Sequence, residues 1–414
     1  TLSLAKSGTG TWILTTNNTY TGTTTVNGGT LSLAGVNGSL ASSTGYVLAG
    51  GTLLLANTSA ANNTNRLRDA SAITLNGGTL SFSNNGGSVN YSENAGAVTV
   101  NQNASTIATA QADLGQTSTL RFASLSRNAG GSVNFTGTGL GVDSRNRIFI
   151  TTGMAEGLIG PWATVNGTHL AAYSAANGVY ASDDAAVFTD IAARGPSTIV
   201  SNDASFVRIN LPGEDGPIEL GSEVTRVTAL IQNTETSATV NTLDKTLQTA
   251  ALAVSEGMAS VTVGVAANDG RLTPLLPNGE LALNNASASP LTVNAVLADT
   301  GASSLLSKYG TGAAILTASN TFAGTVSVFG GSLVLANSNA LQNVSLGTAG
   351  TVFDSSVASH AFTLGGLTGS FTAPLTDNAA NAVALTVGKN NANTTLSGSL
   401  TGNGSLIKAG NGTL

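Results

Sequence analysis

Residues 4–34 read LAKSGTGTWILTTNNTYTGTTTVNGGTLSLA, and residues 306–336 repeat this stretch as LSKYGTGAAILTASNTFAGTVSVFGGSLVLA. The second copy follows the first at a constant offset of 302 residues, without a gap. A third copy begins at residues 406–414, where Lys408 heads the same Lys-x-Gly-x-Gly pattern 100 residues after Lys308. Repetition in a fixed register predicts an architecture in which similar units stack on their neighbours.

Each copy has the pattern of strands that turn at a pair of glycines. Leu31 and Leu33 alternate with Thr30 and Ser32, as in a half-buried strand, and glycines 28–29 can take the positive φ of a corner. The pair recurs at residues 50–51, 77–78 and 330–331. The first steps, 22 and then 27 residues, are about one coil of a β-solenoid, whereas a hairpin at Asn-Gly is the alternative. We expect these leucines to face the interior: Leu31, Leu33, Leu53, Leu80, Leu333 and Leu335.

Three motifs in these copies resemble the autotransporter-associated β-strand repeat, a passenger-associated repeat of autotransporter passengers and giant bacterial surface proteins. They are Lys-x-Gly-x-Gly-x-(Leu/Trp), Asn-Thr-(Tyr/Phe)-x-Gly and Gly-Gly-(Thr/Ser)-Leu. Residues 125–135, 160–168 and 388–395 resemble spacer regions of the long members, and the likeness is loosest near 175–260. The resemblance implies an exported, right-handed parallel β-helix that forms an elongated stalk and has no enzyme activity.

Composition agrees with a solenoid. The 414 residues are too many for one ordinary globular core, but a solenoid grows by stacking. Charged residues make up only 9% of the chain, against about 25% in a typical soluble domain. Hydrophobic residues at 41% exclude a disordered chain, and the surplus of Thr, Ser, Asn and Gly suits outward faces and corners. The net charge of −6 provides no basic face, so nucleic acid is excluded as a partner.

The chain contains no cysteine, which removes disulfides, thiol chemistry and Cys-ligated metals. It has no run of 18 apolar residues, so we expect no transmembrane segment. It starts at Thr1 instead of Met, as a processed chain or a slice of a longer one would. Because both ends read as uncapped strands, we expect more β-helix beyond each, in the same polypeptide or by head-to-tail stacking of copies.

One continuous solenoid is expected, a rod on the order of 80–100 Å long. We divide it into regular coils with the first repeat, irregular coils with longer loops, and coils with the second and third repeats: 1–118, 119–304 and 305–414. Residues 244–258 fit a helix and an extended strand equally well. Strands are expected around residues 184–189, 198–211 and 224–232.

Acidic residues are too scattered for the clustered carboxylates that polysaccharide-cleaving β-helices use. Asp183 and Asp184 are adjacent, so on a strand they would point to opposite sides. Glu214 and Asp215 could hold Ca²⁺ together with carbonyl oxygens, but the alternating acidic loop of a calcium hand is missing. We therefore predict no catalytic residue, no metal-binding residue and no cofactor.

The only histidines are His169 and His360, and neither lies in a nucleophile-elbow sequence. A Ser-His-Asp site needs one histidine, so their number excludes nothing, and His169 is expected at the surface beside a turn. Trp12 and Trp162 could stack on a sugar if exposed, but we favour their filling the interior. A small charged group is expected to form a solvated loop: Arg66, Arg68 and Asp69.

These observations favour a non-enzymatic structural module of an extracellular bacterial fibre, surface layer or autotransporter-like stalk. Its expected partner is itself, end to end or in tandem, with an adhesive role towards cell-surface glycans as an addition. The alternative is a tailspike-like β-helix that binds or degrades surface polysaccharide. That alternative needs a groove with several acids and aromatics on one face, and 5% aromatic residues do not favour it.

Overall fold

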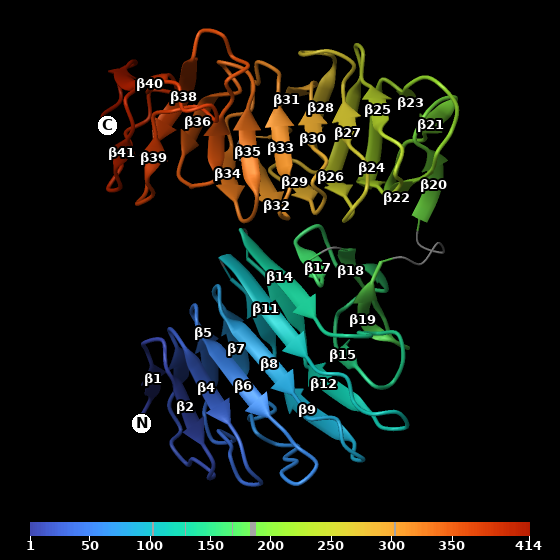
Figure 1. Ribbon diagram of the computed structural model, residues 1–414, viewed down its shortest axis with the longest axis vertical. Helices are drawn as coiled ribbons and strands as arrows, with labels where there is room; N and C mark the ends of the chain where they lie inside the picture. The colour runs from blue at the N-terminus through green and yellow to red at the C-terminus, as the bar shows by residue number, and fades with distance from the viewer. Residues whose placement is uncertain (102, 129, 168, 183–187, 302–303) are drawn as a thin grey trace. The chain divides into compact units, whose positions relative to one another are not determined.

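The computed structural model describes residues 1–101, 103–128, 130–167, 169–182, 188–301 and 304–414. Every helix-or-strand element in these ranges is a β-strand, and nearly all neighbouring strands pair in parallel, which confirms the predicted all-β solenoid (Figure 1). The chain forms two compact units, Thr1–Asp183 (unit 1) and Asp184–Leu414 (unit 2). Each unit has its own cluster of buried hydrophobic side chains.

Unit 1 stacks its strands into three sheets. The first sheet contains, in spatial order, β1 (Leu4–Lys6), β3 (Thr24–Val26), β5 (Gly45–Leu48), β7 (Ala72–Leu75), β10 (Val98–Val100) and β13 (Leu125–Arg127). The second contains β2 (Thr11–Leu14), β4 (Thr30–Leu33), β6 (Thr52–Ala56), β8 (Thr79–Ser83), β11 (Asn103–Thr109), β14 (Gly131–Thr136) and β17 (Ala163–Val165). The third contains β9 (Tyr91–Ala95), β12 (Ser118–Phe122) and β15 (Arg147–Ile150).

The strand register in unit 1 confirms the coil length that the glycine pairs predicted. Thr30 pairs with Thr52, and Thr52 pairs with Thr79, both in parallel, so successive coils are 22 and 27 residues long. The hairpin alternative is therefore wrong for this segment. Gly29, Gly50 and Gly77 have φ of +59°, +93° and +80°. Because L side chains rarely adopt this region, a glycine is required at each corner.

Unit 1 ends in an antiparallel motif that the sequence analysis did not anticipate. Strand β18 (His169–Ser174) pairs antiparallel with β17, with β16 (Gly157–Leu158) and with β19 (Gly178–Ala181). Asn166 and Gly167 have φ of +53° and +73° where the chain reverses after β17. Asn-Gly therefore begins a hairpin here, although the same dipeptide lies at a solenoid corner near residue 28.

Unit 2 has two long parallel sheets and a smaller group of strands towards its C-terminal side. The first sheet contains β20 (Phe188–Ala192), β22 (Asn202–Leu211), β24 (Val224–Gln232), β26 (Thr246–Val254), β29 (Glu280–Asn285), β32 (Leu305–Tyr309) and β34 (Thr325–Val328), with β28 (Arg271–Pro274) and β31 (Val296–Leu297) beside it. The second contains β21 (Ser197–Ile199), β23 (Ile218–Leu220), β25 (Ala238–Asn241), β27 (Val261–Val263), β30 (Leu291–Val293), β33 (Ala313–Leu316), β35 (Ser332–Leu335) and β37 (Thr351–Phe353). The remainder are β36 (Leu341–Leu346), β38 (Ala361–Leu367), β40 (Ala384–Val387) and β42 (Ser405–Lys408), and the pair β39 (Ala373–Pro374) and β41 (Leu400–Thr401).

The expected strands of unit 2 are largely confirmed. Residues 224–232 form β24 as predicted, and residues 198–211 contain parts of two strands, β21 and β22. The segment with two readings, 244–258, is extended, because β26 covers Thr246–Val254. Part of the predicted strand at 184–189 lies outside the described residues, and β20 begins at Phe188.

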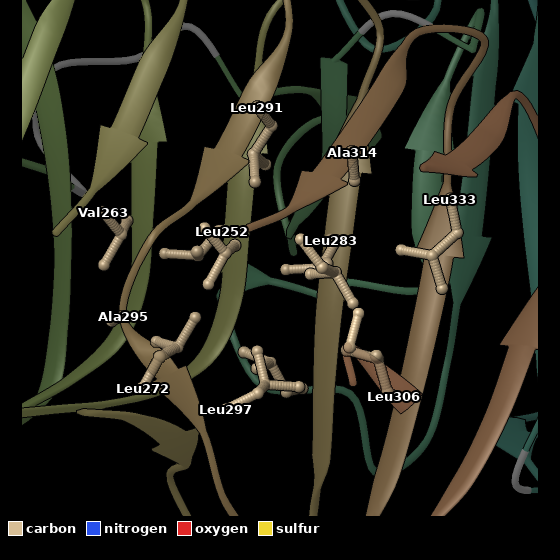
Figure 2. Packing of buried hydrophobic residues seen from close by; sticks show 14 of the residues in the cluster. Leu252, Val263, Leu272, Leu283, Leu291, Ala295, Leu297, Leu306, Ala314 and Leu333 are labelled. Atoms are coloured by element: carbon tan, nitrogen blue, oxygen red, sulfur yellow. The ribbon is translucent and has the colours of Figure 1, made fainter. Parts of the chain in front are cut away.

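Aliphatic side chains from facing strands fill the interior of each unit. In Figure 2, Leu283 and Leu306 from the first sheet of unit 2 and Leu291 and Leu333 from the second belong to one buried cluster. Because the side-chain period of a strand is two, alternate residues within many of the strands join this column, as in β6 and β8 of unit 1. All six leucines that were expected to face the interior are at most 1% exposed: Leu31, Leu33, Leu53, Leu80, Leu333 and Leu335.

Candidate functional site

The lysine that heads each of the first two repeats lies inside the solenoid and binds backbone oxygens. Lys6 is 7% exposed, and its Nζ donates to the carbonyl oxygens of Ser7, Gly8 and Gly28 at 2.8, 3.0 and 3.0 Å. Ser7 and Gly8 belong to the same turn as the lysine, whereas Gly28 is the corner glycine of the next coil. One ammonium group therefore joins two successive coils; we call this arrangement the lysine cage.

The second repeat builds the same cage in unit 2. Lys308 is fully buried, and its Nζ donates to the carbonyl oxygens of Tyr309, Gly310 and Gly330 at 2.5, 3.0 and 3.1 Å. The corner glycine again comes from the following coil. Lys408, in the third copy, is exposed and binds two carbonyl oxygens of its own turn, those of Ala409 and Gly410, at 2.5 and 3.1 Å.

Strand register explains why the lysine points inward. Lys6 pairs with Val26 and Lys308 pairs with Val328, and the side chains of Val26 and Val328 contact the buried clusters. A lysine at an inward position must exchange water for other hydrogen-bond acceptors, and the three carbonyl oxygens fill that role. Burial lowers the pKa of Lys308 to about 7.

The glycines of the motif make the close approach between coils possible. Gly8, Gly310 and Gly410 all have positive φ, +74°, +75° and +64°, which turns the following backbone under the lysine. A Cβ atom on Gly29 would lie 2.3 Å from the carbonyl oxygen of Gly10, and one on Gly331 would lie 2.4 Å from that of Gly312. Both repeats therefore exclude side chains at equivalent places.

The Asn-Thr-(Tyr/Phe) part of the motif makes a second contact between coils. Asn18 Nδ2 donates to the carbonyl oxygen of Ser39 at 3.1 Å, and Asn320 Nδ2 donates to that of Ala340 at 3.0 Å. Phe322 is 1% exposed within the core of unit 2. Each of the two complete repeats thus contributes an ammonium and an amide to the joint with the next coil, and its aromatic residue packs in or against the core.

Unit 1 also contains a buried arginine that sequence analysis placed in a solvated loop. That expectation is wrong for Arg66, which is fully buried, but Arg68 and Asp69 are exposed. The guanidinium of Arg66 donates to five oxygens, those of Asn57 Oδ1 and the carbonyls of Gly35, Gly38, Ala56 and Ala61. The physical reason is that these neutral oxygens around the side chain replace its hydration.

Glu93, on the next coil, binds the backbone of the loop that contains Arg66. Its carboxylate accepts hydrogen bonds from the amides of Arg66 at 3.1 Å and Leu67 at 2.7 Å. Burial raises the pKa of Glu93 to about 7, although these two amides and the nearby Arg66 charge favour the ionised form. Arg66 and Glu93 together connect three coils of unit 1.

The two histidines occupy different settings. His169 is half-buried and begins β18 immediately after the Asn166-Gly167 reversal, close to its expected place beside a turn. His360 Nδ1 lies 2.8 Å from Asp377 Oδ2, and the carboxylate of Asp377 is completely buried. Burial opposes ionisation of Asp377, but hydrogen bonds from Asn381, Ala379 and His360 outweigh it and keep its pKa below the ordinary value. In the part of the chain that the structure describes, His360 makes no hydrogen bond to a serine, so the pair is not a triad.

The acidic candidates do not form a cluster among the described residues. Asp183 and Asp184 lie outside them. Glu214 and Asp215 are exposed, and Asp215 Oδ1 lies 3.7 Å from Arg194 Nη1. An open groove of about 400 Å³ beside this pair is lined by Arg194, Asp215, Gly216, Pro217, Ser237, Thr239 and Val265. With one carboxylate in its lining, the groove lacks the two that glycoside hydrolysis normally requires.

The two tryptophans were both expected to fill the interior. For Trp12 this is wrong: it pairs in register with the inward-facing Leu31, but it is 51% exposed because β2 is the outermost strand of its sheet. Trp162 is half-buried and packs against the core of unit 1, with the guanidinium carbon of Arg127 5.6 Å from its ring centre.

Comparison with known families identifies two matches in this chain. Residues 4–33 and 306–340 match the passenger-associated-transport-repeat, so the chain carries two copies of this autotransporter passenger repeat, as the sequence motifs predicted. The matched segments contain the complete cages of Lys6 and Lys308. No curated protein and no solved structure shows significant similarity to the chain.

The described residues lack two further features. They contain no group of three or more His, Asp or Glu side chains placed to hold a metal ion. Nor does any helix in these ranges have the length and apolar character needed to cross a membrane.

Proposed function

We propose that this chain is a non-enzymatic structural module of an extracellular bacterial fibre, surface layer or autotransporter-like stalk. The observation that carries the proposal is the coincidence of two passenger repeats with continuous columns of parallel coils. Parallel coils joined by repeated polar contacts suit a rigid spacer, because each coil is fixed by its neighbours. The absence of a carboxylate pair from the groove beside Arg194 supports a role without catalysis.

Protease treatment of intact cells of the source bacterium tests the location. The chain is expected to be released into the medium or degraded, while a cytoplasmic control protein stays intact. Recovery of the full chain only after lysis would contradict a surface location. Purified chain is also expected to release no reducing ends from a panel of bacterial and plant polysaccharides, and reproducible turnover would contradict the non-enzymatic role.

Assembly with further β-helix, in tandem or end to end, is part of the proposed role. The outer strand β2 carries Trp12 and Ile13 at 51% and 60% exposure, and β42 carries Ile407 at 53%. Edge strands of this kind offer unpaired backbone groups and apolar side chains to another coil. Light scattering over a range of concentrations, with electron microscopy, is expected to show end-to-end association, and a monomer at every concentration would contradict self-stacking.

Binding of surface glycans is a second candidate, favoured by the groove beside Arg194 and Asp215. The arginine and carboxylate groups in its lining can bind sugar hydroxyls, and Ser237 and Thr239 add hydroxyl groups to the lining. A glycan array with the intact chain and with an Arg194→Ala, Asp215→Ala variant tests it. Equal signals from both proteins would contradict binding in this groove.

A further inference from the structure

The lysine cage consists of two halves that come from different coils. The local half is the turn that follows the lysine, and Lys6, Lys308 and Lys408 each bind two of its carbonyl oxygens. The remote half is one corner-glycine carbonyl, which lies 22 residues after the lysine in both complete cages, at Gly28 and Gly330. The local half is therefore common to all three copies, and the remote half is described for Lys6 and Lys308.

Hydrophobic alternation alone does not fix how these coils pair. In β1 and β3 the inward residues are Leu4 and Lys6 against Thr24 and Val26, over a pairing of only three residues. A slip of two residues would leave the same faces inward, because the side-chain period of a strand is two. Short strands next to glycine-rich turns therefore need another feature that distinguishes the observed register from a slipped one.

The remote carbonyl provides that feature, because it lies two residues beyond the position opposite the lysine. Val26 and Val328 stand opposite Lys6 and Lys308, and Gly28 and Gly330 follow two residues later. A slipped coil would place a different backbone group over the ammonium, so the charge-assisted hydrogen bond to the corner-glycine carbonyl would not form. A second lysine at the valine position would also place two like charges on adjacent strands.

We propose that the lysine head of each repeat is a recognition site for the corner glycine of the next coil and selects the register in which that coil stacks. The partner it accepts is a coil with an uncharged residue opposite the lysine and a Gly-Gly corner two residues later. The glycine pair fits because a side chain on its second residue would collide with the preceding turn, as at Gly29 and Gly331.

Disulfide trapping tests the proposal, because the chain has no cysteine of its own. Leu305 pairs in register with Thr325 across β32 and β34, so Leu305→Cys with Thr325→Cys reports the observed register. Leu305→Cys with Ser327→Cys, or with Ala323→Cys, reports a slip of two residues, which in the observed register leaves the Cα atoms too far apart to bridge. Each pair is refolded from urea under reducing conditions and then oxidised, with Lys308 present or replaced by Met.

With Lys308 present, we expect the in-register pair to cross-link and the two offset pairs not to. Lys308→Met is expected to shift the ratio of in-register to offset products by about tenfold, the equivalent of one charge-assisted hydrogen bond. Leu316→Ala, which removes a buried side chain of β33 outside the cage, serves as the destabilised control and should leave the ratio unchanged.

An unchanged ratio in Lys308→Met would overturn the proposal. Loss of both products would overturn it as well, because the lysine would then hold the coils together without selecting their register. The same design applies to the first repeat, where Ala5 pairs with Thr25 and Lys6→Met replaces the lysine. A changed ratio in one repeat and an unchanged ratio in the other would show that register selection is not a general property of the repeat.

Discussion

The ammonium nitrogen of Lys308 lies 3.1 Å from the carbonyl oxygen of Gly330, and Lys6 binds Gly28 in the same way over 3.0 Å. These bonds occur in different units of the chain, between residues with the same spacing in sequence. Each connects a buried side chain to the backbone of the following coil. In both repeats a polar contact therefore supplements the hydrophobic column that holds the coils together.

Lys308→Met is expected to lower the free energy of unfolding of unit 2 by about 2 kcal/mol, because buried carbonyl oxygens lose their donor. The loss is limited, since burial also disfavours the charged amine that the variant removes. Urea denaturation followed by circular dichroism measures the change. Lys389→Met is the matched control, because Lys389 is exposed and its Nζ donates to Gln342 Oε1 at the surface, and it should change stability little. Equal stability of Lys308→Met and the native chain would contradict this role.

Much of the fold was predictable because it follows from periodicity. The steps between glycine pairs gave the lengths of the first coils, and the alternation around Leu31 and Leu33 gave the inward face. The antiparallel strands after β17 were not predictable, because Asn-Gly occurs both at solenoid corners and at the Asn166-Gly167 reversal. The dipeptide is the same at both places, so whether it forms a corner or a hairpin depends on the strand that pairs next to it.

The polar contacts were harder to foresee than the hydrophobic ones. Lys6 and Lys308 gave one signal that could have been read: each is a charged residue at an inward position of a repeated strand. Arg66 and Glu93 lie 27 residues apart outside the repeat, and nothing in the local sequence of a polar loop indicates that five oxygens surround the arginine. Burial of an arginine such as Arg66 depends on how loops from neighbouring coils pack around it, and the sequence pattern does not predict that packing.

Gly29→Ala should destabilise unit 1 far more than Gly8→Ala, although both glycines have positive φ. A Cβ on Gly8 meets nothing within 4 Å, so this variant has only backbone strain, about 1 kcal/mol. A Cβ on Gly29 would lie 2.3 Å from the Gly10 carbonyl oxygen, and the coils would have to separate. We expect a loss of more than about 3 kcal/mol in urea denaturation. Similar losses of stability in the two variants would show that the positive φ, and not the contact with the neighbouring coil, is the reason for glycine at both positions.

Glu93 predicts a pH dependence of the stability of unit 1. Its pKa is raised by burial from 4.5 to about 7, so the folded chain holds its proton at a pH where the unfolded chain has released it. The stabilisation is complete below pH 4.5 and is lost as the pH rises through about 7, with a size on the order of 3 kcal/mol. Glu93→Gln should flatten the measured curve in this window. A curve with the same slope in both proteins would exclude Glu93 as its source.

Replacing Arg66 by Met is expected to cause the largest loss of stability in unit 1. The variant keeps most of the apolar stem of the side chain, but it removes the guanidinium hydrogen bonds to five oxygen atoms and the charge close to Glu93. Breaking a buried charged network from one side typically costs about 3–5 kcal/mol. Arg68→Met is the matched control, because Arg68 is exposed two residues away and should change stability by no more than about 0.5 kcal/mol.

Hydrogen exchange separates the local from the global effect of Arg66→Met. The guanidinium binds backbone oxygens at Gly35, Gly38, Ala56 and Ala61. Protection of the amides against exchange should therefore fall in those segments and at the backbone amides that donate hydrogen bonds to the Glu93 carboxylate. Amides of β11 and β14, further along the second sheet, should keep their protection as long as the unit stays folded. Uniform loss of protection across unit 1 would mean that Arg66 supports the whole stack of coils instead of joining the loops around it.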